Sequence, residues 1–189
     1  MGIGNTATGW RWPARLLHSG MAGLILFQLS LGFRMVRLVD DIYVKFGLYQ
    51  THKSWGFVIF ALAILRLAWR ASQPTPQLSA GMRRFDVAAA RGAHLALYRL
   101  MIVLLVSGWL MASASPLEDE YGMRTMVFAW FALPDPYQPG SKALEAVFRS
   151  VHAWAAFAMA VLLVGHAAAA LRHHFACRDA VLQRMVLGR

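Results

Sequence analysis

The chain has 189 residues, of which 58% are hydrophobic and only 15% are charged, and its mean hydropathy is +0.46. This balance excludes an ordinary soluble domain and indicates an integral membrane protein with room for about four spans. The formal net charge of +10 does not indicate a nucleic-acid partner, because most Lys and Arg flank apolar runs and lack interleaved aromatics. The single cysteine, Cys177, excludes an internal disulfide and a C-x-x-C-H site for covalent haem.

The first two apolar runs each carry a histidine near their start. The first predicted span covers about residues 14–36 and contains His18. The second covers about 47–69 and contains His52. A polar, basic connection over residues 71–91 then separates these two spans from the rest of the chain.

A third predicted span, about 93–113, also carries a histidine, His94, near its start. The loop that follows, 114–140, is long, acidic and rich in turn residues. Within it, residues 121–133 are too few and too aromatic to cross a bilayer, and we expect them to lie against the membrane surface or to cap the bundle.

The last predicted span, about 150–172, carries two histidines. Ser141 is a plausible N-cap for its helix, which we expect to begin outside the hydrocarbon. His152 and His166 are fourteen residues apart, so an α-helix places them on nearly the same face, about 21 Å apart along its axis. One face of this helix therefore presents two imidazoles at different depths.

The distribution of Lys and Arg predicts the orientation. Eleven lie in, or at the span ends next to, the N-terminal segment, the loop between spans two and three, and the C-terminal tail. Six lie in, or at the span ends next to, the other two loops, and the last of these also holds five of the nine acidic residues. Positively charged loops face the cytoplasm, so we expect an all-α, four-helix transmembrane bundle, a single domain over residues 1–189, with both termini in the cytoplasm.

This topology sorts four histidines by depth. His18 and His166 fall near the cytoplasmic face, and His52 and His152 fall near the outer face. Structural zinc needs four ligands at one point, and each level offers about two. Two axial imidazoles on either side of a flat ring suit a b-type haem, whose iron then has no open position and passes electrons. The pattern thus predicts two non-covalent b haems.

Two further polar residues lie within the third span. Arg99 is deeper than the other cations, so it is our candidate for a haem propionate partner. His94 has no partner at its depth. It could handle protons at a quinone pocket, because imidazole titrates near neutral pH, or it could be a structural histidine.

Several segments resemble one family. They are Leu16-Leu17-His18, Thr51-His52-Lys53-Ser54-Trp55-Gly56, residues 93–98, and the last span from Val151-His152 through Gly165-His166 to Phe175. Together with residues 66–76 and 179–185 they extend the similarity over nearly the whole chain. The chain resembles the bacterial cytochrome b-561 family, four-helix dihaem cytochromes of the inner membrane that are also similar to the cytochrome b subunits of nickel hydrogenases.

The resemblance implies that His18 and His166 bind one haem iron and that His52 and His152 bind the other. It also implies electron exchange with ubiquinone, and the best characterised relative oxidises superoxide. The loop 114–140 departs most from the family, so the electron donor is not indicated.

Three functions therefore remain open at this point. The first is quinone-linked electron transfer across the inner membrane, including superoxide:ubiquinone oxidoreductase activity. The second is a membrane-anchor cytochrome b subunit for a periplasmic redox partner protein, with the acidic outer loop as docking surface. The third, of another class, is a small ion or proton transporter, which would be colourless.

Overall fold

Four long helices form an elongated bundle in the computed structural model, which describes residues 4–6, 9–76, 82–122, 124–137, 139–186 and 188. They are α1 (Trp12–Arg37), α2 (Ile42–Ser72), α3 (Arg84–Ala114) and α5 (Lys142–Arg172). Each is long and apolar enough to cross a membrane. Each also contains one predicted span and extends beyond it, so part of the polar connection 71–91 is helical.

Local signals in the sequence set the starts of these helices. Pro13 lies in the first turn of α1, where a missing N–H costs nothing. The Asp41 side chain accepts a hydrogen bond from the Val44 N–H at the start of α2. Ser141, as its sequence context predicts, accepts one from Leu144 at the start of α5.

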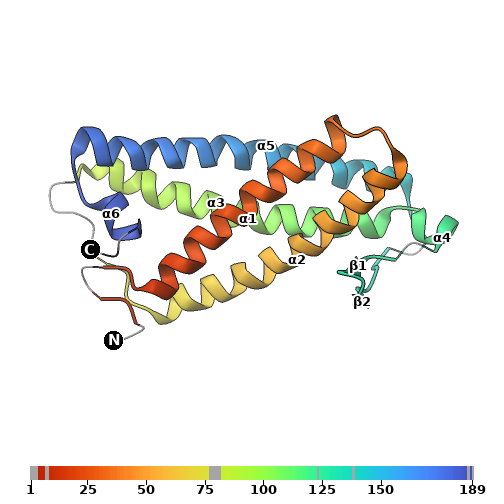
Figure 1. The fold of residues 1–189 in the computed structure, drawn as a ribbon, viewed down its shortest axis with the longest axis horizontal. Helices are drawn as coiled ribbons and strands as arrows, with labels where there is room; N and C mark the ends of the chain where they lie inside the picture. The colour runs from red at the N-terminus through yellow and green to blue at the C-terminus, as the bar shows by residue number, and fades with distance from the viewer. Residues whose placement is uncertain are drawn as a thin grey trace.

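The helices associate as two pairs (Figure 1). α1 packs along α2 and α3 packs along α5, whereas α1 and α2 approach the backbone of α5 closely at few points. Both chain termini lie at one end of the bundle, which we call the termini end. A small β-hairpin lies at the opposite end, the hairpin end.

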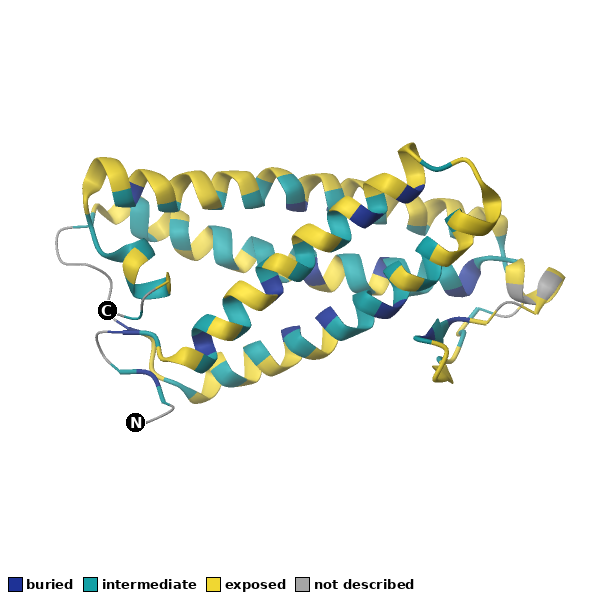
Figure 2. Cartoon of the chain, in the orientation of Figure 1, coloured by how far each residue is buried: buried dark blue, intermediate teal, exposed yellow. Residues whose placement is uncertain are grey.

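One buried cluster of the core joins all four long helices. Met21, Ala63, Met101 and Met159 pack together there with at most 7% of each exposed. We call these four residues the methionine layer. Elsewhere the helices turn apolar side chains outward, as Figure 2 shows; Trp154 is 72% exposed. Such a surface suits a lipid environment.

The loop 114–140 contains a short helix, α4 (Leu117–Tyr121), and a hairpin of β1 (Met126–Val127) and β2 (Phe131–Ala132). Phe128 and Ala129 in the turn have positive φ angles of 47° and 61°. The N–H of Phe128 donates to the Ser54 hydroxyl of α2 at 2.8 Å. The segment predicted to lie on the membrane or cap the bundle is therefore a hairpin tied to α2.

At the termini end, polar contacts connect the segment after α5 to itself and α5 to α3. The π-helical turn η1 (His173–Cys177) and α6 (Val181–Val186) follow α5 and reverse the chain direction. His173 is buried, and its Nδ1 lies 2.6 Å from an Asp179 carboxylate oxygen. Arg172 pairs with Asp86 at 2.5 Å and so joins α5 to α3.

Candidate functional site

At the hairpin end, imidazoles from two helices face each other. The ring centroids of His52 (α2) and His152 (α5) are 6.1 Å apart, with an interplanar angle of 78°. A glycine of a third or fourth helix lies against each ring. A Cβ atom on Gly32 would come 3.5 Å from His52 Cε1, and one on Gly108 would come 3.1 Å from His152 Cε1. Both rings therefore lie against bare helix backbone.

Hydrogen bonds determine which nitrogen of His152 is available. Its Nδ1 lies 3.0 Å from the Leu104 carbonyl and 3.2 Å from the Ser107 hydroxyl. A carbonyl oxygen can only accept, so Nδ1 carries the proton and Nε2 keeps a free lone pair. This is the arrangement usual for a metal-binding histidine, whose other nitrogen donates to a carbonyl.

His52 is held differently. Its backbone carbonyl accepts a hydrogen bond from Gln28 Nε2 at 2.8 Å, which ties α1 to α2 beside the ring. The Nδ1 atom is buried and has no hydrogen-bond partner in the described part of the chain. His52 is therefore fixed through its backbone and by Gly32, while His152 is fixed through its ring.

At the termini end, three imidazoles and a guanidinium gather. The centroids of His18 (α1) and His166 (α5) are 6.3 Å apart, and the rings are tilted by 45°. His94 of α3 lies closer to His166, at 5.1 Å, with its ring edge-on. Arg66 of α2 lies within electrostatic range of all three, and its Nε donates to the Tyr98 hydroxyl at 2.9 Å.

All four long helices share one spacing. The pairs, each fourteen residues apart, are His18 with Gly32, His52 with Arg66, His94 with Gly108, and His152 with His166. Fourteen residues are close to four helical turns and about 21 Å, so each helix places one of these residues at either level. The hairpin-end level comprises Gly32, His52, Gly108 and His152; the termini-end level comprises His18, Arg66, His94 and His166.

The two facing pairs fit the axial ligands of a haem. Two imidazoles on opposite sides of an iron, each with a metal–nitrogen bond of about 2.0 Å, have ring centroids roughly 6 Å apart. His52 and His152 at 6.1 Å, and His18 and His166 at 6.3 Å, match this separation. Each pair also bridges helices with few backbone contacts, where a flat ring could lie. No group of three or more His, Cys, Asp or Glu that could hold a metal ion occurs among the described residues.

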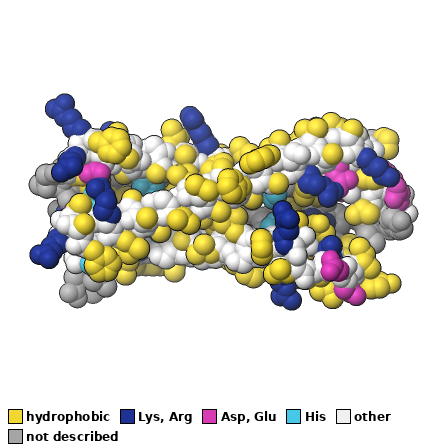
Figure 3. Space-filling view, turned by 90° about the horizontal axis from the view of Figure 1, so that it is seen from above, with side chains coloured by type: hydrophobic (Ala, Val, Ile, Leu, Met, Phe, Trp, Pro, Cys, Tyr) yellow, Lys and Arg dark blue, Asp and Glu magenta, His cyan; other side chains and the backbone are white. Residues whose placement is uncertain are grey.

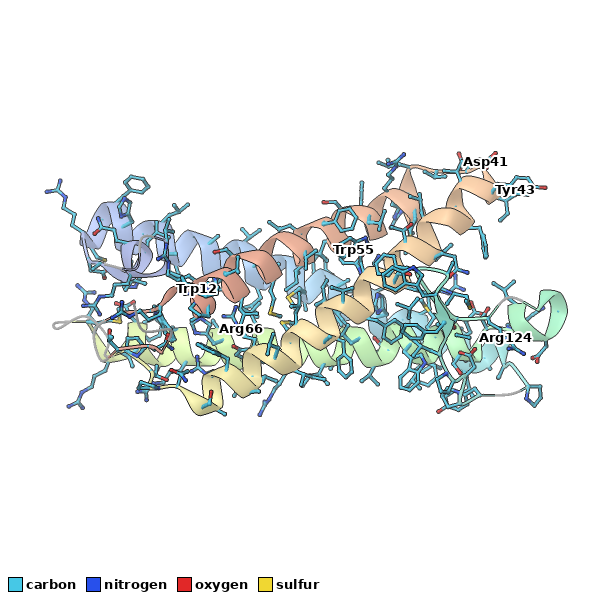
Figure 4. All side chains as sticks on the ribbon, turned by 60° about the horizontal axis from the view of Figure 1, so that its bottom comes forward. Trp12, Asp41, Tyr43, Trp55, Arg66 and Arg124 are labelled. Atoms are coloured by element: carbon cyan, nitrogen blue, oxygen red, sulfur yellow. The ribbon has the colours of Figure 1, made fainter. Side chains whose placement is uncertain are left out.

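Arg99 and His94, the candidates for a propionate partner and for proton handling, lie in different surroundings. Arg99 lies on the exposed side of α3. His94 points into the bundle beside His166. Arg66, which the sequence analysis did not single out, lies inside α2 between Trp55 and the termini end (Figure 4). The spacing from His52 is the signal that could have identified it.

Four membrane-length helices with facing imidazoles at two depths define a membrane cytochrome of the b type, in which histidines hold haem without a covalent bond.

Comparison with known proteins supports this assignment to the b-type cytochromes. Residues 9–188 match the model of the prokaryotic cytochrome b561 family. The chain is 30% identical over 184 residues to cytochrome b561 homolog 2 of Escherichia coli (strain K12), which covers 97% of this chain and 90% of that protein. The chain therefore belongs to the prokaryotic cytochrome b561 family and is a haem-containing membrane electron carrier.

Proposed function

We propose that this protein carries electrons across the bacterial inner membrane through two b haems. His18 and His166 bind the iron near the cytoplasm, and His52 and His152 bind the iron near the outer face. The observation that carries this proposal is the pair of facing imidazoles at each level, at 6.3 and 6.1 Å. When bound, the haem iron would supply one-electron chemistry, and the two histidines at each level would hold it.

The side chains of this protein position and insulate the cofactors. The Leu104 carbonyl orients His152, and Gly32 and Gly108 leave room for the rings. The methionine layer separates the two levels with polarisable, water-excluding side chains. No side chain in this scheme makes or breaks a bond.

Charge supports an orientation with both termini in the cytoplasm. Residues 34–53 and 117–149, which belong to the hairpin end, carry seven cationic and seven acidic side chains. The rest of the chain carries the other twelve Lys and Arg and only two acidic residues. In Figure 3 most charged side chains on the visible face lie toward the two ends. The positive excess belongs to the termini end, which therefore faces the cytoplasm.

The electron acceptor in this proposal is ubiquinone, and superoxide is the candidate donor at the outer face. Two superoxide anions would each give one electron, and ubiquinone would take both electrons and two protons. The products are two molecules of dioxygen and one ubiquinol. Lys53, next to His52, supplies positive charge near the outer site, and His94 remains a candidate for handling protons.

A direct test mixes the purified holoprotein with superoxide and ubiquinone. We expect quinone reduction above the uncatalysed rate. We also expect the visible absorption bands of the reduced form of a low-spin bis-histidine haem. A colourless protein would contradict the cytochrome proposal itself. A red protein without superoxide-dependent quinone reduction would contradict only the choice of donor.

A periplasmic protein donor is the second candidate, because of the hairpin. Trp130 at its turn is 80% exposed and Phe131 is 52% exposed, in a loop whose sequence is acidic. Exposed aromatic side chains in an acidic loop suit a docking surface for a redox protein. Co-purification that is lost in Trp130→Ser would support this donor.

A further inference from the structure

Arg66 is a positive charge inside a membrane-spanning helix. It precedes the end of α2 at Ser72 by six residues, at the level of His18, His94 and His166. Its side chain is only partly exposed. A guanidinium at this depth is costly unless it pairs with an anion or faces a polar cavity. The position therefore calls for a negative partner.

The described part of the chain provides no such partner. The acidic residues that the structure describes at the termini end, Asp86 and Asp179, are engaged with Arg172 and His173. The one hydrogen bond of Arg66 in the described structure is from its Nε to the Tyr98 hydroxyl, and the guanidinium carbon lies 5.8 Å from the Tyr98 ring centroid. Tyr98 holds the guanidinium in place and leaves its two terminal nitrogens to bind something else.

We propose that Arg66, oriented by Tyr98, binds a propionate carboxylate of the haem held by His18 and His166. The planar fork of a guanidinium matches a carboxylate, and the pairing is strongest where water is excluded. This inference rests on the proposed haem at the termini-end level. It assigns the carboxylate to Arg66 instead of Arg99, because Arg99 lies on the exposed side of α3.

The same spacing that relates the two levels explains why α2 can serve both. His52 and Arg66 lie fourteen residues apart and share one face of α2. The helix thus contributes an iron ligand at the hairpin end and a carboxylate partner at the termini end. At the hairpin-end level the α2 position that corresponds to Arg66 is His52, and the neighbouring cation is Lys53.

A fixed positive charge beside one haem changes its reduction potential. The reduced haem carries one positive charge less than the oxidised haem, so Arg66 favours reduction at the termini end. Electrons that enter at the hairpin end would then move toward the termini end.

The test compares Arg66→Gln, Arg66→Lys and the matched control Arg99→Gln in purified holoprotein, with a redox titration that resolves the two haems. We expect Arg66→Gln to lower the potential of the termini-end haem, to speed its loss on detergent dilution, and to shift its propionate bending band in resonance Raman spectra. Arg66→Lys should restore part of the potential. Arg99→Gln should match the wild type.

Tyr98→Phe provides a second variant that keeps the charge and removes its orienting oxygen, and we expect a smaller shift of the same sign. An unchanged potential and Raman band in Arg66→Gln, or the full shift in Arg99→Gln, would overturn the inference. So would a wild-type potential that follows chloride or phosphate concentration, since an exchangeable anion would then occupy the site. A wild-type protein without two haems would instead refute the proposed function.

Discussion

The two levels of the bundle use the same positions for different purposes. At the hairpin-end level, α1 and α3 contribute glycines, on which a Cβ atom would come within 3.5 Å of His52 or His152. At the termini-end level the corresponding residues are His18 and His94, and Arg66 replaces the histidine of α2. Glycines thus lie beside the facing pair at one level, and a third imidazole and a guanidinium lie beside the pair at the other. Two haems bound at these levels, as proposed, would therefore differ in affinity and potential.

The largest expected effects come from the ligands. We expect His152→Ala to lose the hairpin-end haem and keep the other, and His166→Ala to do the reverse, because each iron would lose one of two axial bonds. Haem-to-protein ratio and redox titration measure this. His94→Ala is the matched control and should keep both haems, although His94 lies nearer to His166 than His18 does. If the termini-end haem were lost in His94→Ala but kept in His18→Ala, His94 and not His18 would be its ligand.

A smaller effect should be confined to the hairpin end. Ser54→Ala removes the acceptor of the Phe128 N–H, at a cost of about 1–3 kcal/mol if that donor stays buried. The turn with positive φ at Phe128 and Ala129 should then loosen. Hydrogen exchange over residues 126–132 would report it. Ser30→Ala, which removes a hydroxyl bonded only within α1, should leave the exchange unchanged.

The glycines of the hairpin-end level offer a matched pair. Gly108→Ala would place a methyl group 3.1 Å from His152, and overpacking of this kind costs about 1–3 kcal/mol. Gly32→Ala would make an ordinary contact of 3.5 Å and gain about 0.5–1 kcal/mol of helix stability. We expect haem release on heating to shift down in the first variant only. An equal shift in both would contradict the packing argument.

The smallest effect is expected at Ser107. Its hydroxyl lies 3.2 Å from His152 Nδ1, but the Leu104 carbonyl at 3.0 Å already accepts that proton. Ser107→Ala should therefore change the stability of the hairpin-end haem by less than about 1 kcal/mol. A loss as large as that in Gly108→Ala would mean that the hydroxyl, not the carbonyl, orients the ring.

Much of the fold could be predicted from the sequence, because membrane helices follow from hydropathy and charge alone. The four apolar runs correspond to the four long helices, and the helices bring His18 to His166 and His52 to His152 as depth suggested. The depth of a residue in the membrane follows from its position within its own span, so it can be predicted from a single sequence. Haem ligation by these residues stays a prediction until the spectra of the variants are measured.

Other features of the site could not be predicted, because they depend on contacts between helices. Arg66 lies close to the end of the predicted span 47–69, and its depth depends on how far α2 continues. Gly108 carried no sign that His152 would lie against it. The hairpin turn lacks the glycine or asparagine that usually signals positive φ, and Ser54 of a distant helix holds it instead.

The methionine layer also determines what kind of work electron flow can do. Met21, Ala63, Met101 and Met159 carry no group that exchanges protons, so the centre of the bundle can conduct electrons without conducting protons. Transfer between the levels moves a charge about 21 Å through a hydrocarbon core roughly 30 Å thick. Moving one charge across the whole membrane changes the free energy by about 2.3 kcal/mol per 100 mV of membrane potential, so this transfer would change it by about 1.6 kcal/mol per 100 mV. Turnover of this cytochrome would then be electrogenic, and its rate would depend on the membrane voltage.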